Sequence, residues 1–172
     1  KQMIYLNIGA NLPLKDGGRE TNILKAINHL KKLNLNLIKI SSFYETPSYP
    51  NNLDPKFINL CVKFESNLKA IELLNELKKI EKKLGRTRIE KNEPRTCDID
   101  IIDFNGEIIK NDELETPHPR LHLRNFVIYP LKEIEPNWFH PIYNKNIDSF
   151  FKELDKNSHN EITRLIKSDI LN

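Results

Sequence analysis

Two kinds of hydrophobic spacing alternate along the chain up to about residue 104. Apolar residues recur at nearly every second position in four segments, residues 4–8, 35–44, 57–64 and 97–104, which is typical of strands. They recur at every third or fourth position in residues 20–33 and 71–84, which is typical of amphipathic helices. Gly85 then stands where a helix C-terminal cap is expected. The order strand–helix–strand–strand–helix–strand predicts an α+β fold, the ferredoxin-like β-α-β-β-α-β sandwich.

The third predicted strand has two chemically distinct faces. One face presents only apolar side chains, Ile58, Leu60, Val62 and Phe64. The other presents a mixed set, Phe57, Asn59, Cys61 and Lys63. Side chains alternate between the two faces of a strand, so the apolar set is expected under the two helices. We expect the opposite face of the sheet to be free for a ligand.

The rest of the pattern is less regular. Residues 45–56 carry three prolines and predict a stiff loop, and residues 86–96 are polar with three arginines. Asn105-Gly106 is a strong hairpin signal, so residues 107–109 are expected to return along the fourth strand. Helical spacing is found again in 126–133, despite Pro130, and in 147–154. We expect residues 1–172 to form one domain with a C-terminal extension around an edge of the sheet.

Composition excludes several classes of protein. The 172 residues are 38% hydrophobic and 30% charged, as in ordinary globular proteins. Two cysteines, Cys61 and Cys97, cannot form a disulfide framework, and no apolar run approaches the roughly 18 residues of a membrane span. A net charge of +3 is too small to indicate nucleic-acid binding. A cytoplasmic protein acting as a monomer, without a membrane or nucleic-acid partner, is expected.

The sequence Asp98-Ile99-Asp100 contains the clearest chemical signal. Two residues apart on a strand, Asp98 and Asp100 share a face, with Cα atoms roughly 6–7 Å apart. Adjacent carboxylates repel each other and lose hydration on burial. A hard cation such as Mg²⁺ removes both penalties, and the pair can hold one ion or bridge two. A solvated strand face is the alternative reading of this pair.

Basic residues surround the carboxylate pair on both sides in the sequence. Arg86, Arg88 and Arg95 precede it, and His118, Arg120, His122 and Arg124 follow it. The guanidinium fork fits phosphate oxygens two at a time, so the set indicates a metal–polyphosphate site. Neither G-x-x-x-x-G-K-[ST] nor G-x-G-x-x-G is present. If ATP binds, side chains hold its phosphates.

Seven segments together resemble the 6-hydroxymethyl-7,8-dihydropterin pyrophosphokinase family of folate biosynthesis. The main one is KNEPRTCDIDII at 91–102. The others, in family order, are YLNIGANL at 5–12, SSFYETP at 41–47, FIN at 57–59, GRTR at 85–88, PHPRLH at 117–122 and RNFV at 124–127. The likeness extends over almost the whole chain. It implies transfer of the β,γ-diphosphate of ATP to the hydroxymethyl group of the dihydropterin, with release of AMP.

The resemblance also implies roles for individual residues. Asp98 and Asp100 would hold two Mg²⁺ ions that bridge the triphosphate, with Arg86 and Arg95 closest to the reacting β-phosphate; these four residues are the catalytic set. The phosphates would be lined by Arg86, Arg88, Arg95, His118 and Arg124. Adenine and ribose contacts would come from Leu74, Lys78 and Ile101. The pterin would contact Thr46, Pro47, Phe57, Asn59 and Phe126.

The sequence departs from the family pattern in three places. Glu93 stands where a glycine is usual, Asn92 lies in a loop one residue shorter than in members with a tryptophan there, and Leu123 replaces a usual glutamate. The first two bear on how the loop 86–96 closes over the substrates. Two other functions share features of the pattern: the palm of a two-metal nucleotidyltransferase and a non-catalytic RNA-recognition module. The second lacks its aromatic strand motif and would place carboxylates on the RNA face.

Overall fold

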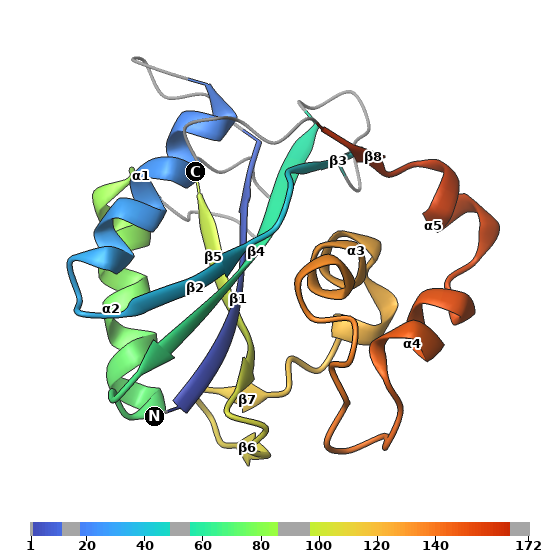
Figure 1. Ribbon diagram of the computed structural model, residues 1–172. Coiled ribbons are helices and arrows are strands. Elements are labelled where there is room, and N and C mark those ends of the chain that lie inside the picture. The colour runs from blue at the N-terminus through green and yellow to red at the C-terminus, as the bar shows by residue number, and fades with distance from the viewer. Residues whose placement is uncertain (1, 12–17, 49–55, 86–96, 166–172) are drawn as a thin grey trace.

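A six-stranded sheet with helices on both faces forms the centre of the computed structural model, which describes residues 2–11, 18–48, 56–85 and 97–165 (Figure 1). Its strands are β1 (Gln2–Ala10), β2 (Asn36–Ile40), β3 (Tyr44–Thr46), β4 (Phe57–Ser66), β5 (Asp98–Phe104) and β8 (Thr163–Arg164). The helices are α1 (Arg19–Lys31), α2 (Ala70–Lys83), α3 (Asn125–Ile134), α4 (Ile147–Glu153) and α5 (Lys156–Asn160). The fold is mixed α and β.

The strands pair in the order β5-β1-β4-β3-β8, and β2 also pairs with β4. All of these pairings are antiparallel. The two longest strands, β1 and β4, are therefore central, and β2 and β3 follow each other along the same side of β4. This order places the N-terminal strand between the strand that carries Asn59 and the strand that carries Asp98.

α1 and α2 cover one face of the sheet, as the helical spacing predicted (Figure 1). Their buried residues, including Ile23, Leu30, Leu73 and Leu77, pack with the apolar face of β4 into one cluster. Gly85, at φ +85°, follows the end of α2 in the left-handed conformation that a C-terminal cap requires. Ile71, expected on the buried face of α2, is instead exposed on its first turn.

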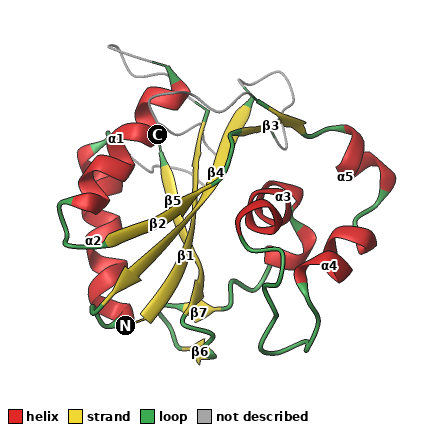
Figure 2. Cartoon of the chain, in the orientation of Figure 1, coloured by secondary structure: helices red, strands yellow, loops and turns green. Residues whose placement is uncertain are grey.

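The opposite face of the sheet is only partly free, which corrects the expectation from sequence. α3 packs across it, and α4 and α5 follow on the same side (Figure 2). Val127, Ile128 and Leu131 of α3 form a second apolar cluster with Tyr5 and Cys61 of the sheet. The helix predicted at 126–133 is therefore confirmed, and its apolar side covers the part of this face around Tyr5 and Cys61. The part where β1, β4 and β5 carry the polar side chains Asn7, Asn59, Asp98 and Asp100 is left for a site.

The turn at Asn105-Gly106 forms, but the predicted return strand does not. Both residues have positive φ, +53° and +69°, as a tight hairpin turn requires. Residues 107–109 nevertheless do not pair with β5. Instead β6 (Ile109–Lys110) pairs with β7 (Glu115–Thr116) as a separate two-stranded ribbon. Asn105 and Gly106 therefore determine the conformation of the turn itself. The strand after the turn, β6, pairs with β7, which follows it in the sequence.

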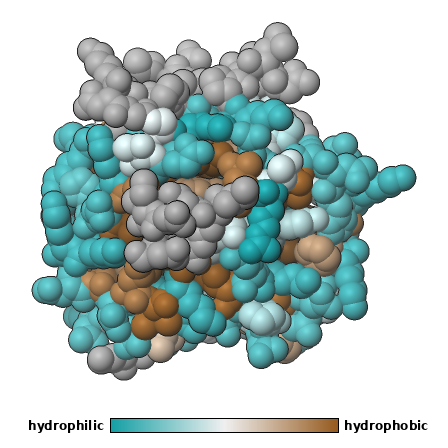
Figure 3. All heavy atoms as spheres, turned by 45° about the horizontal axis from the view of Figure 1, so that its top comes forward, coloured by the Kyte–Doolittle hydropathy of each residue, from teal (hydrophilic) through white to brown (hydrophobic). Residues whose placement is uncertain are grey.

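The surface in the view of Figure 3 is largely hydrophilic, with hydrophobic residues gathered mostly toward the middle of the molecule. None of the described helices is long and apolar enough to span a membrane.

Candidate functional site

Paired residues form two rows across the sheet on the face that also carries α3. In the first row Tyr44 of β3 pairs with Asn59 of β4, Asn59 with Gly9 of β1, and Gly9 with Asp98 of β5. Directly paired residues of an antiparallel sheet present their side chains on the same face. An amide and a carboxylate therefore face the same space, on two strands separated only by the strand of Gly9.

The second row lies one step further along the strands. Cys61 of β4 pairs with Asn7 of β1, and Asn7 pairs with Asp100 of β5. Cys61 is fully buried, and burial raises the pKa of its thiol, so it stays a neutral, inert thiol. Asp98 and Asp100 thus share a face, as the sequence predicted, with Asn7 beside the second of them.

The absence of a side chain at Gly9 makes room for the amide of Asn59. A Cβ built on Gly9 would lie 3.2 Å from Asn59 Cγ and closer still to Asn59 Oδ1. Asn7 Nδ2 donates a hydrogen bond of 2.9 Å to the same Oδ1. Asn59 is 4% exposed and Asn7 is 3% exposed. The amide of Asn59 is held from one side by Asn7 and occupies the space above Gly9.

The donor set near Asp98 and Asp100 suits a hard cation. Both carboxylates are half-buried. Asn7 Oδ1 is a buried oxygen that has no hydrogen-bond partner among the described residues. Carboxylate and amide oxygens are the ligands that Mg²⁺ takes, and such sites are commonly completed by water and phosphate oxygens. Within the described ranges, no group of three or more His, Cys, Asp or Glu side chains is arranged to hold a metal ion.

His118 and Arg124 bring basic groups to the carboxylates. The backbone N–H of His118 donates to Ile102 O of β5 at 2.8 Å, which ties its loop to the strand that carries both aspartates. Burial, followed by the charges of Arg124 and Arg120, lowers the pKa of His118 to about 4, while Asp98 acts in the opposite direction. The neutral ring accepts the N–H of Arg120 at Nδ1, 3.1 Å away. Its hydrogen is then on Nε2, where a ligand oxygen can accept it.

The guanidinium of Arg124 is half-buried and lies near the carboxylates of Asp100 and Asp98. Burial lowers its pKa, whereas Asp100 and, more weakly, Asp98 raise it. Its Cζ also lies 5.5 Å from the centre of the Phe126 ring, within range of a cation–π contact. Arg124 therefore links the acidic end of the sheet to the first turn of α3.

Four of the five residues implied for the pterin lie along the same end of the sheet. Thr46 pairs with Phe57 at the end of β3, and Pro47 follows it. Thr46 is 4% exposed. Phe57 shares the face of Asn59, because the two are two residues apart on β4. The fifth, Phe126, comes from the start of α3, which covers that same face, and is partly buried against the second apolar cluster.

The three residues implied for adenine and ribose lie elsewhere. Leu74 and Ile101 pack in the apolar cluster under α1 and α2, and Lys78 is exposed on α2. None of their side chains shares the face of Asp98 and Asp100. They lie instead where α2 packs against β5, the strand at the edge of the sheet.

The arginine-rich segment lies outside the described residues. Arg86, Arg88 and Arg95, and with them the departures at Asn92 and Glu93, fall within 86–96. Leu123 is described, and its side chain is 68% exposed in the short helical turn Leu121–Leu123. This side chain points into solvent.

Sequence reasoning missed three residues of the site. Asn7, Gly9 and Tyr44 join the two rows only through the pairing of β1, β3 and β4. Asn7 carried a signal that could have been used, since a polar residue interrupts the apolar first strand two residues before a glycine. Tyr44 carried none, because a tyrosine near the end of a strand is common.

The chain is similar to several named proteins. Residues 5–136 match the model of the family described as 7,8-dihydro-6-hydroxymethylpterin-pyrophosphokinase, HPPK. A 2-amino-4-hydroxy-6-hydroxymethyldihydropteridine pyrophosphokinase of Aquifex aeolicus is 41% identical over 150 residues, 87% of this chain and 91% of that protein. The protein of that name in Bacillus subtilis is 39% identical over 131 residues, 76% of each chain.

Longer proteins contain a similar stretch. A folic acid synthesis protein of Dictyostelium discoideum is 43% identical over 141 residues, 81% of this chain but 20% of that protein. A solved structure of HPPK-DHPS in complex with substrates has a TM-score of 0.71 at 16% identity, covering 96% of this chain and 46% of that one. At that identity the likeness shows the fold alone. Through the family match and the relatives of comparable length, the chain belongs to the 7,8-dihydro-6-hydroxymethylpterin-pyrophosphokinase family.

Proposed function

We propose that this protein is an ATP-dependent pyrophosphokinase of folate biosynthesis that acts on 6-hydroxymethyl-7,8-dihydropterin. The hydroxymethyl group loses its proton to solvent, and its oxygen forms a bond to the β-phosphorus of ATP. The bond from that phosphorus to the oxygen that bridges the α and β phosphates breaks, and this oxygen leaves with AMP. The products are the pterin diphosphate and AMP.

The first row across the sheet is the observation that carries the proposal. Asn59 and Asp98 share a face and are separated by the single strand of Gly9. Neighbouring strands lie roughly 4.7–4.9 Å apart, so their Cα atoms are on the order of 10 Å apart. At this distance the amide of Asn59 can bind the polar edge of a pterin ring. The carboxylate of Asp98 can then act near the phosphate that lies at the end of the same ring.

Asp98 and Asp100 are the residues proposed to hold two Mg²⁺ ions. When bound, the ions neutralise phosphate charge and draw the phosphate oxygens into a fixed geometry. The two carboxylates keep that positive charge beside β5. Asn7, with its buried oxygen next to Asp100, offers a further oxygen to a cation or to a water molecule bound to it.

His118 and Arg124 are proposed to bind phosphate oxygens together with Arg86, Arg88 and Arg95. A neutral His118 donates from Nε2 and does not add to the positive charge that Arg124 and Arg120 already supply. Because phosphoryl transfer is mostly positioning and charge stabilisation, fixed donors of this kind act on the charge that develops at the leaving oxygen. Leu74, Lys78 and Ile101 are proposed to lie near adenine and ribose at the edge of β5, with Ile101 using its backbone because its side chain is buried.

The pterin is proposed to lie over Gly9 with its polar edge on Asn59. Thr46 and Pro47 line its side, and the rings of Phe57 and Phe126 face its planes. Each aromatic contact contributes about 0.5–1.5 kcal/mol beyond area burial. Asn7 holds Asn59 Oδ1, so that Asn59 Nδ2 is the group presented to the heterocycle.

Finer features of the fold and setting belong to the same proposal. The order β5-β1-β4 followed by β2 and β3, with α1 and α2 on one face, is supported as a ferredoxin-like topology by its antiparallel pairing. That residues 1–172 form one domain, that the protein is a monomer and that it is cytoplasmic remain predictions.

Product analysis tests the function directly. Incubation with ATP, Mg²⁺ and 6-hydroxymethyl-7,8-dihydropterin should release AMP and not ADP, as resolved by chromatography. Asp98→Asn should reduce AMP release by at least 10³-fold. Asp103→Asn is the matched control, because Asp103 is a buried carboxylate of the same strand that accepts from Trp138 Nε1, away from both rows. Release of ADP, or equal losses in the two variants, would refute the proposal.

A further inference from the structure

Between β2 and β3 the edge of the sheet contains one extra residue, in addition to the register shift within β2 between Leu37 and Lys39. Ile40 of β2 pairs with Val62, and Tyr44 of β3 pairs with Asn59. Residues 41–43 therefore lie opposite residues 60–61, so that three residues oppose two. This is the count of a β-bulge, which bends a strand and redirects the side chains that follow it.

The bulge decides which face of the sheet β3 presents to the site. With the pairing of β2 continued unchanged, Tyr44 would oppose Ile58, whose side chain lies in the apolar cluster under α1 and α2. The extra residue moves Tyr44 opposite Asn59 and Thr46 opposite Phe57. A slip of one residue flips every side chain of a strand to the other face, so Thr46 reaches the pterin side only while the bulge is kept.

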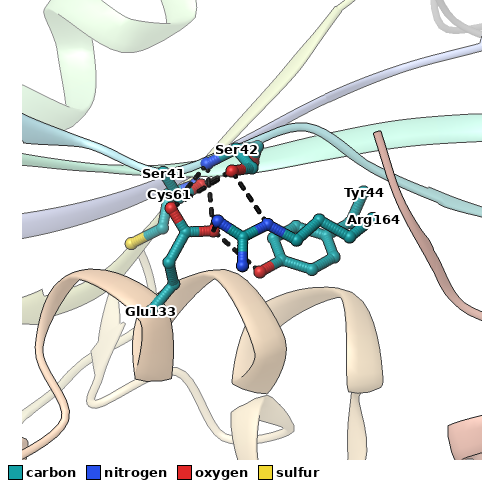
Figure 4. Close-up of polar contacts among 6 residues, drawn as sticks. All are labelled: Ser41, Ser42, Tyr44, Cys61, Glu133 and Arg164. Carbon is teal, nitrogen blue, oxygen red and sulfur yellow. Dashed lines mark hydrogen bonds and ion pairs between the residues drawn. The ribbon is translucent and has the colours of Figure 1, made fainter. Parts of the chain in front are cut away.

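Hydrogen bonds within the sheet account for only part of the bulge. Ser41 N–H donates to Cys61 O at 2.9 Å. Cys61 N–H donates to Ser41 Oγ at 2.9 Å, so a hydroxyl stands in for a backbone carbonyl. Ser42 N–H does not donate to β4. It points out of the sheet toward α3 and donates to Glu133 (Figure 4).

The carboxylate of Glu133 in α3 accepts the hydrogen bonds of the bulge that the sheet does not accept. Its carboxylate accepts Ser42 N–H at 2.9 and 3.1 Å, Ser42 Oγ at 3.3 Å and the hydroxyl of Tyr44 at 2.7 Å. Arg164 of β8 lies 3.7 Å from the same carboxylate and donates to Ser42 Oγ at 3.1 Å. Figure 4 shows these groups converging on the carboxylate from α3, β8 and the β2–β3 edge.

We infer that Glu133 is a positioning residue for pterin binding, because its carboxylate holds the bulge that turns Thr46 toward the pterin side. The inference rests on the proposed function. Glu133 also lies on α3, the helix whose first turn carries Phe126, so one carboxylate connects the two sides of the proposed pterin site. Glu133 itself contacts neither substrate in this scheme, since its oxygens are occupied by Ser42 and Tyr44.

Glu133→Gln tests the inference with almost no change in side-chain volume. Glutamine keeps one acceptor oxygen but adds a donor, so it cannot accept from Ser42 and Tyr44 at both of its terminal atoms. The Kd for 6-hydroxymethylpterin, measured by calorimetry with a Mg²⁺-bound α,β-methylene ATP analogue present, should rise by at least tenfold. The Kd of the nucleotide analogue alone should stay within about twofold.

Glu135→Gln is the matched control. Glu135 directly follows α3, faces the same side of the sheet and accepts from Tyr5 at 2.9 Å and Lys63 at 2.8 Å. Neither partner belongs to β3 or to the bulge. This variant should lose comparable thermal stability with unchanged pterin affinity. Tyr44→Phe removes one donor to Glu133 and leaves the carboxylate in place, so it should weaken pterin binding less than Glu133→Gln does. This variant tests the inference if Glu133→Gln does not fold.

The register of β3 can be read without any ligand. Nuclear Overhauser contacts between Tyr44 and Asn59 should be present in the wild type and in Glu135→Gln, and weakened or replaced by contacts to Ile58 in Glu133→Gln. Unchanged contacts together with unchanged pterin affinity in Glu133→Gln would overturn the inference, and so would equal losses in both glutamine variants. A wild-type protein that binds no pterin would instead refute the proposed function, while the register measurement would still decide the role of Glu133.

Discussion

Replacing Gly9 by alanine adds one methyl group at the point where the proposed pterin and phosphate sites meet. Gly9 lies within β1, and its φ is not in the left-handed region, so the backbone accepts alanine. The new Cβ would lie less than 3.0 Å from Asn59 Oδ1, which real Cβ atoms essentially never show. The amide of Asn59 must therefore move, because it is the end of a side chain while the neighbouring backbone is held in the sheet.

The expected loss follows from the bonds that this movement breaks. The 2.9 Å bond from Asn7 to Asn59 is worth about 0.5–1.5 kcal/mol. If the bond from Asn59 to the pterin is lost as well, the group left unsatisfied costs about 1–3 kcal/mol. Only this second loss enters pterin binding, and about 1–3 kcal/mol corresponds to roughly a 5- to 150-fold rise in the pterin Kd.

Stability should change little in the same variant. Alanine at a compatible position restricts the unfolded chain and stabilises the fold by about 0.4–1 kcal/mol. This gain approximately offsets the lost bond between Asn7 and Asn59. For a chain of this size a difference of about 1 kcal/mol shifts the melting temperature by only about 2–4 °C. A large loss of pterin affinity with a nearly unchanged melting temperature is therefore the expected signature.

Calorimetry with 6-hydroxymethylpterin and with the ATP analogue, each titrated separately, checks the prediction. Gly18→Ala is the matched control, because a Cβ there meets only Glu20 Oε2 at 3.4 Å, an ordinary contact. Wild-type pterin affinity in Gly9→Ala, or an equal loss of affinity for the nucleotide, would show that the space above Gly9 is not where the pterin lies.

Three further predictions follow from the same geometry. Asp100→Asn should lower turnover by at least about 10³-fold while leaving the melting temperature equal or higher, since it removes repulsion from Asp98; near-normal turnover in the presence of Mg²⁺ would contradict the metal role. Asn7→Ala should raise the pterin Kd by roughly fivefold, about the worth of one hydrogen bond, with nucleotide affinity retained in the same calorimetric titration. His140, 2% exposed, accepts Ile142 N–H and Tyr143 N–H at Nδ1, and burial lowers its pKa to about 4. Its stabilising contribution is therefore complete above about pH 6.5 and is lost as the pH falls toward 4. Denaturant unfolding at pH 7, 5.5 and 4.5 should show a shallower decline in His140→Asn than in the wild type, and identical slopes would refute this.

The local pattern of the chain determined its strands, its main helices and the faces of β4. Ile58, Leu60, Val62 and Phe64 lie in the cluster under α1 and α2, while Cys61 lies in the other cluster, as the alternation predicted. These features depend on the geometry of one strand or one helix turn, so neighbouring residues suffice to specify them. The shared face of Asp98 and Asp100 could be predicted for the same reason.

Features that depend on distant residues could be decided only by the tertiary structure. The bulge at 41–43 is held by Glu133, about ninety residues further along the chain. The sequence SSFYET at 41–46 contains no pattern that predicts an extra residue in the strand. Asn7 and Gly9 become neighbours of Asn59 through antiparallel pairing across some fifty residues. The face that was expected to be free from the sequence is partly covered by α3, and the residues after the turn at Asn105-Gly106 do not pair with β5. In each case the residue or element that makes the contact is determined by two requirements: apolar surfaces must be buried, and buried backbone N–H and C=O groups must form hydrogen bonds. Which groups are buried depends on the folded chain as a whole, so neighbouring residues in the sequence do not specify it.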